Sequence, residues 1–226
     1  MPELASPKPL TTSRLILFPA ILSLAVTLLR LIGELRNWSE TWFSKETGGV
    51  VPSGVSWIVG ITWLAIPFGI YFALKLASAG RGPRSIRKAL VYALIGLIIM
   101  RLPFLVLSWF PLAFPQVLIV IWLFMALAAV LQYVAWPDLF QVLLAYGMGA
   151  RIPVVVVMFL AMLGNWGTHY DYVGMPQQFQ MSLVPKFFWL AFFPQLIFWV
   201  GFTILLGSVA GGLTTALFAR KCGVAL

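Results

Sequence analysis

The chain has 226 residues, of which 62% are hydrophobic and 9% are charged, and its mean hydropathy is +0.99. Soluble domains are nearer half apolar and a quarter charged, so this composition excludes an ordinary soluble fold. A single cysteine excludes a disulfide-rich scaffold, and the abundance of Leu, Val, Ile and Phe excludes disorder and collagen. We therefore predict one integral membrane domain over residues 1–226, an all-α polytopic helix bundle.

Six apolar segments are long enough to cross a bilayer core about 30 Å thick, which takes roughly 20 residues per helix. In chain order, we predict transmembrane helices over residues 15–33, 54–74, 89–110, 116–134, 139–163 and 187–211. The last apolar run continues from Phe187 to Ala219, which is too long for one straight span. We therefore expect a kink or break near Pro194, because proline interrupts helical hydrogen bonding.

The loop between the second and third spans is strongly basic and contains Lys75, Arg81, Arg84, Arg87 and Lys88. Short loops rich in Lys and Arg stay on the cytoplasmic side, and an even number of spans then places both termini there. We expect a multi-pass protein of the plasma (inner) membrane, with the lipid bilayer as its main partner and no nucleic-acid partner. Docking of anionic lipid or of a cytoplasmic protein is the alternative interpretation of this basic loop.

Two arginines lie inside predicted spans, and each is followed two residues later by proline: Arg101 by Pro103, and Arg151 by Pro153. Each arginine is thirteenth in its span, so both are expected near the same depth, close to the bilayer midplane. A charge at that depth costs about 2.5–3.5 kcal/mol on insertion scales, so both side chains should face the bundle interior. Because guanidinium groups match carboxylate and phosphate geometry, we predict that the pair binds a small anion or an anionic lipid in a transporter-like bundle.

A structural role is the alternative for these arginines. Each proline frees a backbone carbonyl four residues earlier, at Ile99 and Gly149, and each arginine leans towards that oxygen. Arginines bonded there would lock kinked helices together, with Pro103, Gly147, Gly149 and Pro153 at the kinks. The chain would then be a non-catalytic structural or assembly protein, or a scaffold of the membrane-trafficking type.

A polar cluster of His169, Tyr170 and Asp171 lies in the predicted outer loop. A metal site needs about three ligands of matching type, and the chain offers no P-loop, GxSxG or dinucleotide motif. We therefore predict no metal, no cofactor and no enzymatic activity. A membrane enzyme at the outer surface is a third class, and it requires a cleft that joins His169, Asp171 and another polar group. Closer to the membrane, Arg30 is expected to pair with Glu34, four residues further along one helix.

Small residues recur at helical spacing in two spans, which permits close helix packing. The last span carries Gly207 and Gly211, and the second carries Ala65, Gly69, Ala73 and Ala77. We expect these residues to pack inside the bundle. A homo-oligomer or a membrane partner that uses the Gly207/Gly211 face is the alternative.

Overall fold

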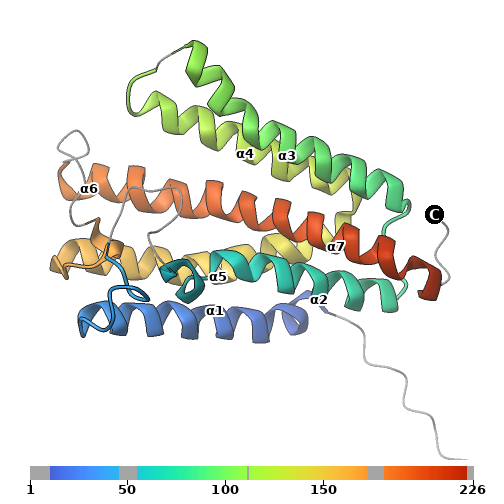
Figure 1. The fold of residues 1–226 in the computed structure, drawn as a ribbon, viewed down its shortest axis with the longest axis horizontal. Helices are drawn as coiled ribbons and strands as arrows, with labels where there is room; N and C mark the ends of the chain where they lie inside the picture. Colours follow the sequence, from blue (N-terminus) through green and yellow to red (C-terminus); the bar gives the residue numbers. More distant parts are fainter. Residues whose placement is uncertain (1–10, 46–54, 111, 173–180, 223–226) are drawn as a thin grey trace, which may run out of the picture.

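The computed structural model describes residues 11–45, 55–110, 112–172 and 181–222, and every regular element in these ranges is a helix (Figure 1). The predicted all-α architecture is therefore confirmed for the described residues. In chain order the elements are α1 (Thr12–Leu35), η1 (Ser56–Val59), η2 (Thr62–Leu64), α2 (Ala65–Ser78), α3 (Ile86–Trp109), α4 (Gln116–Ala135), α5 (Pro137–Gly164), η3 (His169–Asp171), α6 (Leu183–Lys186), η5 (Phe187–Phe192), η6 (Pro194–Trp199) and α7 (Val200–Cys222).

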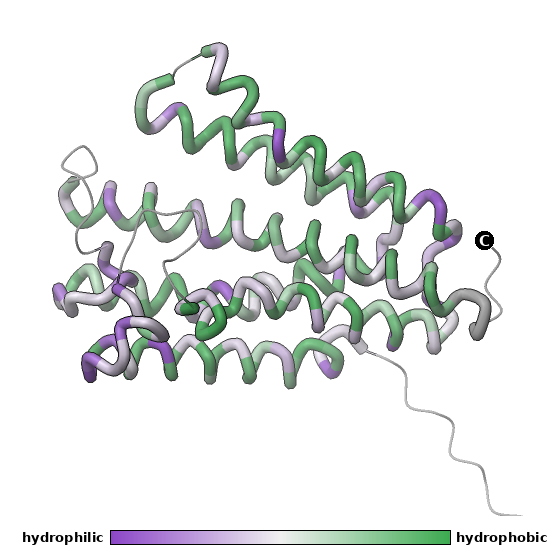
Figure 2. Tube along the Cα trace, in the orientation of Figure 1, coloured by the Kyte–Doolittle hydropathy of each residue, from purple (hydrophilic) through white to green (hydrophobic). Residues whose placement is uncertain are grey.

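Five helical stretches of the described residues are long and apolar enough to cross a membrane: α1, α3, α4, α5 and the continuous stretch Leu183–Phe218. Figure 2 shows hydrophobic residues along the lengths of these helices, with hydrophilic residues gathered mainly towards the two ends of the bundle. The predicted spans 15–33, 89–110, 116–134 and 139–163 match four of these helices to within three residues at each end.

The second predicted span, 54–74, is wrong at both ends. Residues Ser56–Val59 and Thr62–Leu64 form two separate 3₁₀ turns, and α2 continues to Ser78. Gly60 is extended, at φ −105° and ψ 167°, and ends the first turn. The apolar helix Thr62–Ser78 spans about 26 Å at 1.5 Å per residue, so it is shorter than its neighbours. A hydropathy window cannot separate these apolar turns from a helix.

The prediction was a kink or a break near Pro194, and the helix does not break there. Leu183–Phe218 is one stretch of 36 residues, and two π-helical segments, η5 and η6, flank Phe193. Wider π turns bond each residue to the fifth one along the chain, and they are frequent at functional positions. The chain therefore accommodates its proline by widening the helix, and Gln195 faces inward from the second wide segment with 8% of its surface exposed.

The bundle is organised around α7, which packs against α2, α3, α4 and α5, while α1 packs on α5. In Figure 1, α3 and α4 form a hairpin that diverges from the α6–α7 stretch towards one end of the molecule. The figure also places the start of α1, the loop between α2 and α3, and the end of α7 at the opposite end of the long axis.

The backbones of α2 and α7 meet at a seam of small residues. A Cβ on Gly69 would lie 2.5 Å from Gly207 Cα, and one on Gly211 would lie 2.9 Å from both the Ala73 Cβ and a Leu139 methyl. The expected packing inside the bundle is therefore observed. Both α7 glycines are buried by α2 and α5, so a homo-oligomer or membrane partner could reach them only by displacing these helices.

Candidate functional site

The buried face of α1 carries a stripe of polar side chains, which we call the α1 polar stripe: Ser23, Thr27, Arg30 and Glu34. Their spacing of four, three and four residues places them on one face of the helix. None of the four is more than 8% exposed. The stripe faces α5, because Ser23 Oγ lies 3.0 Å from the hydroxyl of Tyr146. A membrane-embedded helix buries such residues only where partners inside the bundle satisfy them.

Glu34, which has no exposed surface, collects three contacts at the end of this stripe. Arg30 Nε donates to its Oε1 at 2.9 Å, which confirms the predicted pair. The backbone N–H of His169 donates to Oε2 at 2.9 Å, and His169 Nδ1 lies 2.5 Å from Oε1. One carboxylate therefore joins α1 to a loop 135 residues further along the chain.

His169 is held as a neutral imidazole in this arrangement. Burial lowers the pKa of His169 and the charge of Arg30 lowers it further, while Glu34 and Asp171 oppose the shift. The net direction is downward because burial, the largest contribution, outweighs the opposing effects of Glu34 and Asp171. Neutral His169 then donates from Nδ1 to Glu34 and leaves Nε2 as an acceptor. No buried side-chain nitrogen among the described residues lacks a partner, so Nε2 belongs to the 22% of the side chain that is exposed.

His169 and Asp171 do not act together. The carboxylate of Asp171 accepts from the N–H groups of Gly167, at 2.9 Å, and Thr168, at 2.7 Å, and from the Thr168 hydroxyl at 2.9 Å. It therefore closes a capping box around its own turn. Among the described residues, His169 contacts Glu34 and Asp171 contacts its own turn, so these two side chains do not form the joint site that the enzyme alternative requires.

Tyr170 lies between two arginines. Its hydroxyl donates to the backbone oxygen of Thr27 at 3.2 Å, and its side chain is 4% exposed. Burial raises the pKa of Tyr170 and the charge of Glu34 adds to this, whereas Arg30 and Arg151 lower it. Both guanidinium groups therefore lie close enough to act on this phenol.

Arg151 is buried in the bundle, with 5% of its surface exposed. Nη1 donates to Gln195 Oε1 at 3.1 Å and Nη2 to Thr62 Oγ1 at 3.2 Å. The guanidinium carbon lies 5.0 Å from the ring centre of Trp199, within the range of a cation–π contact. The predicted bond to the Gly149 carbonyl is not formed, because side chains from η2 and η6 occupy both terminal nitrogens.

Arg151 has no acidic partner among the described residues. The ion pairs found there join Arg30 to Glu34 and Arg81 to Asp138, and Glu34 also contacts His169. Of these groups, Arg30 and Glu34 lie near Arg151, since all three act on Tyr170. A Cβ on Gly60 would lie 3.5 Å from Arg30 Nη1, and Thr62, two residues later, bonds Arg151. The segment 60–62 therefore lies over both guanidinium groups.

Arg101 lies elsewhere, on the exposed side of α3. Its guanidinium carbon lies 5.3 Å from the ring centre of Phe104, and α3 packs on α4 and α7 rather than on α5. The structure therefore does not bring Arg101 and Arg151 together.

Both helices continue as α-helices through Pro103 and Pro153. The predicted kink glycines are packing positions, since Gly147 approaches Val200 of α7 and Gly149 approaches Ala20 of α1.

The basic loop is anchored at one point. Arg81 Nε donates to Asp138 at 3.0 Å, at the start of α5, and Trp136 Nε1 donates to the Arg81 carbonyl at 2.9 Å. Lys75 and Lys88 lie over the rings of Tyr71 and Tyr92. The side chains of Arg84, Arg87 and Lys88 are exposed, as contact with anionic lipid or a cytoplasmic partner would require.

The described residues contain no group of three or more His, Cys, Asp and Glu side chains placed to hold a metal ion. Comparison of the sequence and the structure with family models, curated proteins and solved structures finds no match. The functional argument therefore rests on the geometry of the buried arginines.

Proposed function

We propose that this chain is a six-span protein of the plasma (inner) membrane whose Arg151 binds an anionic group inside the helix bundle. The observation that carries the proposal is a guanidinium that is 5% exposed and whose two hydrogen bonds go to neutral oxygens. With Arg30 balanced by Glu34 and His169 neutral, the described part of the interior keeps one uncompensated positive charge. An uncompensated buried charge is costly, and a bound anion would offset that cost.

The geometry leaves capacity for such a ligand. A guanidinium has five N–H donors, and the two bonds of Arg151 use two of them. Thr62 and Gln195 are single neutral acceptors that an anion could replace, and they stand on a 3₁₀ turn and a π-helical segment. Transporters place interrupted helices of this kind around their binding sites. These features support a transporter-like or lipid-binding bundle.

The six-span topology adds Thr62–Ser78 to the five longer apolar stretches. With both termini and the basic loop on the cytoplasmic side, the His169 cluster faces outward. Figure 1 places the start of α1, the basic loop and the end of α7 at the same end of the molecule, which agrees with this topology.

The test is ligand-dependent thermal stability of the purified chain in detergent, with phosphate, sulfate, succinate or phosphatidylglycerol added. A ligand at one hundred times its Kd stabilises the folded state by about 2.7 kcal/mol. Wild type and the exposed control Arg14→Gln should both be stabilised by one of these anions. Arg151→Gln should lose the effect, and Arg151→Lys should keep a weaker one because it retains the charge without the fork.

A structural role for Arg151 is the second candidate, because its two bonds tie α5 to η2 and η6. This scaffold function predicts a different result in the same experiment. Arg151→Gln would then lower the thermal stability, while no anion would stabilise wild type more than the variant. That outcome would overturn anion binding.

A further inference from the structure

Arg101 presents a charge on the outside of an apolar helix. α3 is 24 residues long and otherwise apolar from Ala89 to Trp109, yet the Arg101 side chain is exposed. Its contact among the described residues is the ring of Phe104. In a membrane, a charged side chain at this position costs several kcal/mol unless another molecule covers the guanidinium or the side chain reaches water.

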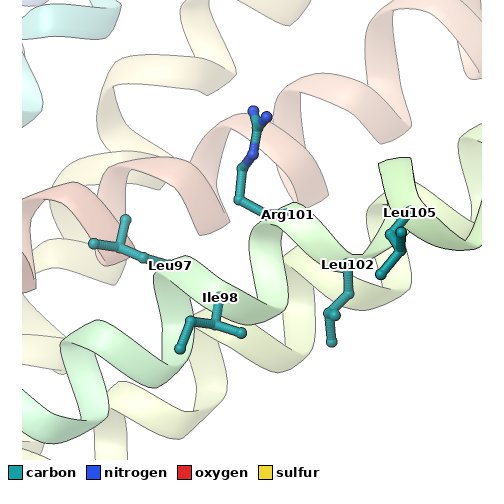
Figure 3. Close-up of a pocket in the computed structure, with 5 residues that line it drawn as sticks. All are labelled: Leu97, Ile98, Arg101, Leu102 and Leu105. Atoms are coloured by element: carbon teal, nitrogen blue, oxygen red, sulfur yellow. The ribbon is translucent and has the colours of Figure 1, made fainter.

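An open apolar hollow of about 370 Å³ lies beside this guanidinium. Its lining consists of Leu97, Ile98, Arg101, Leu102 and Leu105 (Figure 3). In the figure, Arg101 projects to one side of α3 while Ile98 and Leu102 project to the other. The site therefore combines one positively charged side chain with an apolar surface along the helix.

Arg101 is nearer to the C-terminal end of α3 at Trp109 than to its start at Ile86. Its guanidinium lies beside the ring of Phe104, three residues further on. Trp109, at the end of α3, is 75% exposed and is eight residues, or about 12 Å, beyond Arg101 along the helix axis. Exposed tryptophan at a helix end is typical of the membrane–water interface, where phosphates lie.

The apolar helices of a second copy, among the described residues, offer no free carboxylate to supply the missing negative charge. The chain has six acidic residues in all, and only Glu34 and Asp138 belong to apolar helices long enough to span. Glu34 is fully buried and bonded to Arg30 and His169, and Asp138 bonds Arg81 at the first turn of α5. A lipid phosphate supplies the charge and also brings an acyl chain for the hollow.

We propose that Arg101 binds the phosphate of an anionic phospholipid from the leaflet at the Trp109 end of α3. One acyl chain of that lipid lies in the hollow formed by Leu97, Ile98, Leu102 and Leu105. This lipid site is separate from Arg151 and does not depend on anion binding there.

The experiment measures lipid retention by native mass spectrometry on the full chain, released from micelles that contain equal amounts of phosphatidylglycerol and phosphatidylcholine. Wild type should retain phosphatidylglycerol in preference to phosphatidylcholine. Arg101→Gln should weaken that retention about tenfold, as expected for the loss of a charge-assisted hydrogen bond. The matched control is Arg14→Gln, which removes an exposed charge from the first turn of α1 and should leave retention unchanged.

Two further variants separate the charge from the hollow. Arg101→Lys should restore most of the preference for phosphatidylglycerol. Leu105→Trp keeps the charge and fills the hollow, and it should reduce retention of both lipids. Because both positions are exposed, these variants should fold, which elution as the wild-type species on gel filtration would verify. Equal retention by wild type and Arg101→Gln, or an equal loss in Arg14→Gln, overturns the proposal. So does a dimer that only Arg101→Gln dissociates.

Discussion

Substituting Glu34 by glutamine tests the cluster that closes the α1 polar stripe. The change preserves size and removes one charge from a side chain with no exposed surface. The carboxylate contacts Arg30 Nε, His169 N and His169 Nδ1, all within 2.9 Å. Glutamine has a single acceptor oxygen, and its NH₂ group must face at least one of these donors. Arg30 would then carry an unpaired charge at 8% exposure.

Removing one partner of a buried ion pair typically costs about 3–5 kcal/mol, because the remaining charge stays buried. The lost bonds from His169 are part of the same cluster, so their contributions do not simply add. We therefore expect Glu34→Gln to lower the free energy of unfolding by about 3–5 kcal/mol. Domain stabilities are only about 5–15 kcal/mol, so the effect would be large.

The assay is reversible denaturant unfolding in detergent at neutral pH, with exposed Glu40→Gln as the matched control. A surface substitution of this kind is expected to change stability by no more than about 0.5 kcal/mol. Adding Arg30→Gln to Glu34→Gln should recover part of the loss, because the stranded charge is removed. A Glu34→Gln protein within about 1 kcal/mol of wild type would refute the reasoning.

Two further predictions concern packing and pH. Gly69→Ala places a Cβ 2.5 Å from Gly207 Cα and should cost about 1–3 kcal/mol of unfolding free energy. Gly149→Ala, whose Cβ would be 3.6 Å from its nearest neighbour, should be neutral or stabilising. Because burial lowers the pKa of His169 below 6.5, the folded state binds fewer protons than the unfolded state. Stability should therefore be complete above that pH and fall below it. His169→Asn should flatten this dependence between about pH 7.5 and about pH 5, and an unchanged slope would contradict it.

Hydropathy was sufficient to predict the bounds of helices that lipid and neighbouring helices surround along their full length. The ends of α1, α3, α4 and α5 agree with the predicted spans because the apolar runs stop where the helices stop. It failed at Gly60, where an extended backbone divides an apolar run into short turns. Proline chemistry indicated an irregular helix near Pro194, but the sequence did not show that π-helical segments keep the helix continuous there. Both features depend on backbone geometry that composition does not encode.

The sequence predicted that Arg101 and Arg151 act together because their local motifs are alike, but the tertiary packing separates them. The two Arg-x-Pro motifs are alike in sequence, but α3 joins α4 in a hairpin whereas α5 lies against α1 and α7. Arg30 has an acidic partner, Glu34, four residues away, so the sequence does not indicate that it belongs to the anion site. The polar residues at 23, 27, 30 and 34 were the available signal, because their spacing defines one buried helix face.

The surroundings of Arg30 and Arg151 differ in one decisive respect. Both guanidinium groups are buried next to the segment 60–62, but a single carboxylate, Glu34, serves that region, and Arg30 occupies it. If Arg151 only tied α5 to Thr62 and Gln195, a neutral donor could make those bonds without burying a charge. Apart from its contact with the Trp199 ring, a positive charge at this place is useful only if a negative one joins it. This charge balance supports the binding of an anion that enters the bundle from outside. The dependence of stability on anions is therefore the property that distinguishes a binding site from a scaffold.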